Sequence, residues 1–106
     1  MMKNEINRLM EFSSTLSSAE DRRIVESAID IFSDTFLEMI HHAKDRLLGI
    51  GKTEPLDLSK AADALNQLRH LGKGYFDDLP DGTDLRVVAA YVIKFGNELG
   101  PAGRVE

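Results

Sequence analysis

The sequence predicts an all-α fold, a four-helix antiparallel bundle organised around one long helix from about residue 18 to residue 48. Within that range apolar residues recur at steps of three and four, which places them on one face of a helix. Charged residues mostly fall on the opposite side, as in an amphipathic helix. One segment, 87–93, is also compatible with a buried strand, but no second strand-like segment exists to pair with it. The apolar stripe of the long helix consists of Val25, Ala28, Phe32, Phe36, Met39, Ala43 and Leu47.

The long helix has recognisable ends. Ser17 with Glu20, or Ser18 with Asp21, resembles the capping pair that opens a helix. Gly49 follows the last periodic residue and favours termination. An unbroken helix of about 30 residues is about 45 Å long at 1.5 Å per residue. A globule of about 100 residues has a radius of gyration near 13 Å, so one end of this helix is expected to overhang.

The weakest point of the long helix is the tripeptide 33–35, Ser-Asp-Thr, because three modest helix formers follow one another there. A break at this tripeptide would fold the helix back on itself and remove the overhang. The sequence leaves these two outcomes open.

Three further helices are expected, over about 4–16, 56–78 and 84–99, with 100–106 as a loose tail. Gly72 and Gly74 interrupt the third helix, and Gly72 falls on its apolar stripe, where a missing side chain permits close helix approach. The Pro-Asp-Gly turn at 80–82 precedes the fourth helix, with Asp81 or Thr83 as its cap. Gly100 and Pro101 are expected to terminate that helix. The side chains expected to form one contiguous core are Phe32, Phe36, Met39, Leu65, Leu68, Val88, Val92 and Phe95.

Composition restricts the class of protein. The 106 residues suit a single domain over 1–106. Cysteine is absent, and the net charge of −5 disfavours general binding to nucleic acid, which depends on clustered cations. No apolar run approaches the ~20 residues of a membrane span. We therefore expect a cytoplasmic protein that binds neither nucleic acid nor membranes.

No catalytic or nucleotide motif survives inspection. Gly51-Lys52-Thr53 resembles the end of a phosphate-binding loop, but that motif needs a glycine where Arg46 stands. Carboxylates at 77, 78, 81 and 84 cluster near a turn, where capping is their simplest role. Arg69 lies beside the apolar stripe of its helix and needs a carboxylate partner or a route to water. The sequence therefore favours a protein that is not an enzyme and has no cofactor.

One metal-binding interpretation stays open as the alternative. Glu38 and His41 have the Glu-x-x-His spacing of di-metal bundles, but no second such pair exists. These two residues also lie on the side of the helix away from the apolar stripe. His42 and Asp45 complete the only histidine-carboxylate group from which a metal or small-ligand site could be built. We therefore predict no metal site, and keep this group as the alternative.

The preferred hypothesis is a protein-protein interaction or regulatory module. Apolar residues that project outside the main stripes indicate the surface, namely Leu37, Ile40, Ala90 and Ile93. Because an apolar overhang would be exposed in a monomer, a homodimer is expected. Small acidic helical proteins occur among regulatory, immunity and phage-encoded proteins of bacteria. This is an analogy of format, and it leaves the partner unidentified.

Overall fold

The computed structural model describes residues 5–49, 56–71 and 78–103, the last five as backbone. Within these ranges the chain is helical and contains no strand, which confirms the predicted all-α fold of four helices. None of these helices is long and apolar enough to cross a bilayer. The helices are α1 (Glu5–Thr15), α2 (Ala19–Leu48), α3 (Ser59–Leu71) and α4 (Leu85–Gly103).

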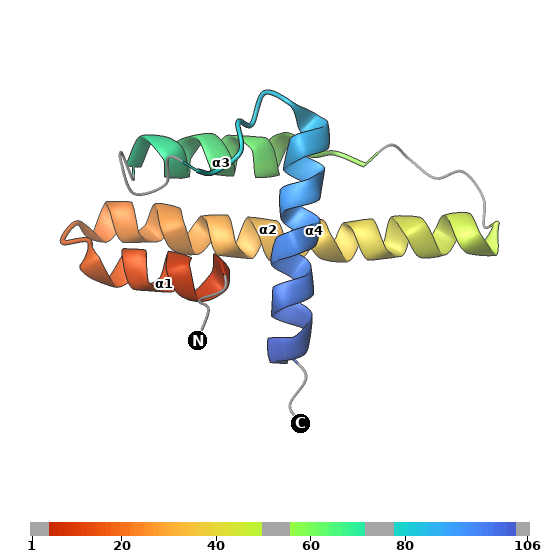
Figure 1. Cartoon of the computed structure of the whole chain (residues 1–106), viewed down its shortest axis with the longest axis horizontal. Helices are drawn as coiled ribbons and strands as arrows, with labels where there is room; N and C mark the ends of the chain where they lie inside the picture. Colours follow the sequence, from red (N-terminus) through yellow and green to blue (C-terminus); the bar gives the residue numbers. More distant parts are fainter. Residues whose placement is uncertain (1–4, 50–55, 72–77, 104–106) are drawn as a thin grey trace.

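The long helix α2 is the axis of the molecule and contacts all three other helices. In Figure 1, α1 and α3 lie along opposite sides of its N-terminal half, and α4 crosses its middle. Helix α4 also contacts both α1 and α3, whereas the described parts of α1 and α3 do not meet. The C-terminal part of α2 extends past α4, as Figure 1 shows. The overhang predicted from its length is therefore present, in a molecule measuring 48 × 36 × 23 Å.

Both ends of α2 agree with the sequence. The Ser18 hydroxyl accepts a hydrogen bond from the backbone N–H of Asp21 at 3.3 Å, so the Ser18 pairing is the cap. Gly49 ends the helix in the left-handed conformation, with φ of 65°. Its N–H donates to the carbonyl groups of Arg46 and Asp45, which satisfies the last turn.

Helix α2 is unbroken at 33–35. The Ser33 and Thr35 hydroxyls donate to the carbonyl oxygens of Ile29 and Ile31, at 2.9 and 2.7 Å. These bonds satisfy both hydroxyls inside the helix, so neither competes with the helical backbone bonds. The alternative of a helix folded back on itself is excluded.

The boundaries of α3 and α4 differ from those predicted. Helix α3 begins at Ser59, whose backbone N–H and hydroxyl both donate to the Asp57 carboxylate. Asp78 lies in a turn, and the predicted course of this helix through Gly72 and Gly74 lies outside the described residues.

The cap of α4 is Asp84 rather than Asp81 or Thr83, because its carboxylate accepts from the Arg86 N–H at 3.0 Å. The helix continues to Gly103 instead of ending at Leu99. Proline fixes φ near the helical value, which is compatible with one further turn at Pro101.

The core lies where α4 meets α2. Phe32 is fully buried and packs edge-on against Tyr91 and Phe95, with ring centroids 5.3 and 5.4 Å apart. Six of the eight predicted core residues are buried, while Phe36 and Met39 are partly buried and pack against that cluster. Further along α2, Leu47 is exposed although the periodicity places it on the apolar stripe, because the other helices do not reach that far. The buried apolar residues are Leu9, Phe12, Val25, Ala28, Phe32, Ala61, Ala62, Ala64, Leu65, Leu68, Leu79, Val88, Tyr91, Val92 and Phe95.

Two glycines allow close approach between elements. A Cβ at Gly96 of α4 would lie 2.1 Å from the Phe36 ring of α2, far inside van der Waals contact. A Cβ at Gly82 would lie 2.5 Å from the carbonyl oxygen of Ala62 in α3. The sequence assigned a close approach to Gly72, but the crossing of α2 and α4 depends on Gly96.

We predict that Gly96→Ala lowers the free energy of unfolding by about 1–3 kcal/mol, because the added methyl group overpacks the crossing. In a Phe36→Ala background the same change should be neutral or stabilising, since alanine favours helix by about 1 kcal/mol over glycine. Urea unfolding of the two single variants and the double variant measures this coupling. Asn97→Ala, at the next and exposed position of α4, is the control. Equal costs of Gly96→Ala in both backgrounds would contradict the contact.

Candidate functional site

The overhanging part of α2 carries large apolar side chains that other helices leave uncovered. Leu37 and Ile40 are 54% and 47% exposed, and Leu47 and Leu48 are 88% and 61% exposed. These four residues are called the overhang face below. They follow Phe36, the residue on which Gly96 of α4 packs, so the exposure begins where α4 has crossed. Monomeric proteins rarely leave contiguous apolar surface of this kind uncovered.

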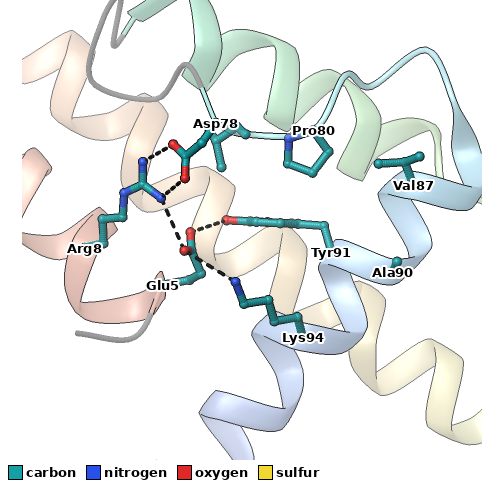
Figure 2. A pocket seen from close by; sticks show the side chains of 9 residues that line it. Glu5, Arg8, Asp78, Pro80, Val87, Ala90, Tyr91 and Lys94 are labelled. Atoms are coloured by element: carbon teal, nitrogen blue, oxygen red, sulfur yellow. Dashed lines mark hydrogen bonds and ion pairs between the residues drawn. The ribbon is translucent and has the colours of Figure 1, made fainter. Parts of the chain in front are cut away.

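The four residues predicted to form an interaction surface occupy two helices. Leu37 and Ile40 lie one turn apart on the overhang face. Ile93, which is 46% exposed, and Ala90 lie on α4. Ala90 also lines a small pocket beside α1 (Figure 2). The structure therefore gives Leu37 and Ile40 a shared surface and places Ala90 in a different setting.

The metal-binding alternative gains no support from the geometry. Glu38 and His41 are exposed on α2, and His42 and Asp45 are partly buried. In the described ranges no three histidine or carboxylate side chains come together in a way that could hold a metal ion.

A second feature is the pocket of about 240 Å³ between the first turn of α1, the segment before α4, and α4 itself. Figure 2 shows one charged wall and one apolar wall. Ligand pockets commonly measure about 300–1,000 Å³, so this pocket is small for an organic ligand. Its lining residues are Glu5, Arg8, Asp78, Leu79, Pro80, Val87, Ala90, Tyr91 and Lys94.

The charged wall is a network centred on the Glu5 carboxylate. Its oxygens accept from Arg8 at 3.3 Å and from the Tyr91 hydroxyl at 3.2 Å, and the Lys94 ammonium lies 3.9 Å away. The Arg8 guanidinium also donates two hydrogen bonds to the Asp78 carboxylate (Figure 2). The network thus joins α1 to α4 and to the segment that precedes α4.

The network changes the protonation behaviour of its members. Hydrogen bonds from Arg8 hold the pKa of Asp78 below its usual range. The same hydrogen bonds raise the pKa of the Arg8 guanidinium further. Burial, followed by the charge of Glu5, raises the pKa of the Tyr91 hydroxyl well above its ordinary value. Arg8 and Tyr91 therefore keep their protons at neutral pH and act as hydrogen-bond donors rather than as acid-base catalysts.

The network has a structural role, because it holds α1 against α4 and against the segment that precedes α4. The Glu5 carboxylate already accepts hydrogen bonds from Arg8 and Tyr91 and forms an ion pair with Lys94, and the Glu5 backbone N–H donates to the Glu98 carboxylate at 2.8 Å. The Arg8 side chain is mostly covered, because it lies between Glu5 and Asp78. The i,i+3 spacing of Glu5 and Arg8 is the one sequence signal for the pair, but spacing does not identify Tyr91 or Asp78 as partners.

Other acidic residues near the turn also have structural roles. A carboxylate oxygen of Asp81 lies 3.9 Å from a guanidinium nitrogen of Arg69. Asp81 is therefore the carboxylate partner that the sequence analysis expected for Arg69. The Asp81 carboxylate also accepts a hydrogen bond from the backbone N–H of Thr83 at 2.9 Å. Asp77 of the predicted acidic cluster and the Gly51-Lys52-Thr53 tripeptide lie outside the described residues.

Comparison of the chain with protein-family models, curated proteins and solved structures finds no match.

We predict that Asp78→Asn destabilises the protein at pH 7 and that this difference shrinks as the pH falls. A carboxyl group whose pKa is lowered in the folded state contributes its full stabilisation above its unfolded pKa, about 3.9 for aspartate, and loses it as the pH falls from there through the lowered pKa of the folded state. Because Asp78 is largely exposed, we expect a difference of no more than about 1 kcal/mol at pH 7. Urea unfolding of both proteins over a series of pH values from 7 downward measures it, and a difference that does not shrink toward acid would contradict the charge pairing.

Proposed function

We propose that this protein is a non-enzymatic protein-protein interaction module that acts through the overhang face and forms a homodimer. One observation carries the proposal: four large apolar side chains are exposed on the part of α2 that extends beyond α4. The hydrogen bonds, ion pairs and helix caps described above give no reason for leaving these four apolar side chains exposed. The cysteine-free composition fits a cytoplasmic setting, which we propose as the compartment.

Energetics favour a covered overhang. Fully burying a leucine or isoleucine side chain contributes about 1.5–3 kcal/mol. The overhang is the last three turns or so of α2, and helix ends without packing fray more readily than packed segments. A partner bound to the overhang face would therefore bury apolar surface and would, at the same time, stabilise the C-terminal end of α2.

A second copy of the chain is the partner that needs no further component. A surface that is complementary to itself forms a closed two-fold dimer, the commonest form of soluble oligomer. The two overhanging ends would then cover each other.

The test is the mass in solution at tens of micromolar, measured by light scattering coupled to size exclusion. We expect a dimer for the natural sequence and a monomer for the variant carrying Leu37→Glu and Ile40→Glu, because glutamate opposes burial of this face. Leu85→Glu is the matched control, since Leu85 is 51% exposed on the first turn of α4, away from the overhang. Circular dichroism should show the same helix content in all three proteins. A monomer for the natural sequence would overturn the homodimer, and a dimer unaffected by the double change would overturn the role of this face.

A further inference from the structure

One side of α2 carries a stripe with the spacing of a coiled-coil seam. Its six positions are separated by three, four, three, four and three residues, the alternation of a and d positions in heptads. All six positions are exposed except Ser33, which is partly buried and whose hydroxyl bonds to the carbonyl of Ile29. This seam consists of Asp30, Ser33, Leu37, Ile40, Lys44 and Leu47.

We propose that two copies of the chain pair along this seam as antiparallel helices, with the two-fold axis between Leu37 and Ile40. This inference rests on the proposed homodimer and specifies its arrangement. In an antiparallel pair an a position of one helix packs in a layer with a d position of the other. Leu37 then packs on Ile40 of the second copy, and the reciprocal pair follows by symmetry.

Charge distribution along the seam selects the antiparallel direction. Acidic Asp30 and Asp34 lie toward one end and Lys44 toward the other, all three exposed. About the proposed axis, Lys44 lies opposite Ser33 of the second copy, between the two aspartates of that copy. A parallel, in-register pair would instead place Lys44 against Lys44 and Asp30 against Asp30. Like charges brought together at an interface cost several kcal/mol, so the parallel pair is disfavoured.

A groove lies where the ends of the seam would meet the second copy. It separates α1 from α2, has a volume of about 620 Å³, and is lined by Met10, Ile29 and Asp30 among others. Met10 is 58% exposed there. Asp30 and Leu47 are equally far from the axis, about 13 Å along the helix. Leu47 of one copy therefore lies opposite Asp30 of the other and reaches the edge of its groove, beside Met10 and Ile29.

The first test exchanges the charges of the seam. We expect Lys44→Glu to weaken the dimer at least about tenfold, because it places a third carboxylate beside two aspartates. Adding Asp30→Lys and Asp34→Lys to that variant should restore the dimer, since the opposite charges meet again with reversed signs. Arg46→Glu is the matched control: it makes the same charge change at an exposed position of α2 on the side away from the seam. Dissociation constants are measured by sedimentation at low salt, where exposed charges are screened least.

The second test uses the absence of natural cysteines to read the helix direction. In the antiparallel pair residue 30 of one copy lies opposite residue 47 of the other, whereas identical residues lie about 26 Å apart along the axis. Disulfides do not form when Cα atoms are more than about 7 Å apart without backbone movement. A mixture of Asp30→Cys and Leu47→Cys chains should therefore oxidise to a mixed dimer, and neither variant alone should cross-link.

The outcomes separate this arrangement from the proposed function. A monomeric natural protein overturns the homodimer and this arrangement together. A dimeric natural protein overturns only the arrangement if Lys44→Glu has no effect, if the triple charge variant fails to recover, or if either cysteine variant cross-links with itself. Recovery of the triple variant together with the mixed disulfide supports the arrangement.

Discussion

The contact between Phe36 of α2 and Gly96 of α4 is the constraint on which the rest of the structure depends. Because Gly96 has no side chain, α4 can lie against the middle of α2 with the Phe36 ring at its surface. Phe32, one turn earlier, is then enclosed by the rings of Tyr91 and Phe95. A side chain at 96 would push α4 outward and loosen this aromatic cluster as well. The crossing thus sets both the position of α4 and the depth of the core.

The same crossing makes the two halves of α2 unequal. Helices α1 and α3 cover its N-terminal half on opposite sides, and α4 holds both by direct contact. The Glu5 network reinforces this arrangement on the α1 side. Hydrogen bonds are directional, so they fix the position of α1 against α4 more specifically than apolar packing does. Beyond Phe36, Met39 still packs against the core, but the side chains of the overhang face meet solvent. The proposed interaction surface is thus the part of a helix that is longer than the bundle packed on it.

The periodicity of apolar residues predicted much of this fold, because the features it predicted depend on residues close together in the sequence. The cap at Ser18, the end at Gly49 and the buried face around Phe32 depend on neighbouring residues of one helix, which the sequence displays directly. Leu37 and Ile40 lie outside the apolar stripe of α2, and this position correctly indicated that they are exposed. Periodicity gives the apolar face of a helix but not how far another element covers that face, which is why Leu47 lies on the apolar stripe and yet is exposed. Gly96 and the partners of Arg8 were missed because they depend on contacts between distant segments.

The central claim is that the overhang face beyond Phe36, which its own bundle leaves exposed, is covered by a second copy of the chain. Amide hydrogen exchange along α2, measured while the protein concentration rises from about 1 µM to about 100 µM, tests this most directly. We predict that residues 37–48 exchange more slowly as concentration increases, while residues 24–36 keep the same slow exchange throughout. Exchange along 37–48 that is independent of concentration, or as slow as that of 24–36 in the most dilute sample, would contradict the account.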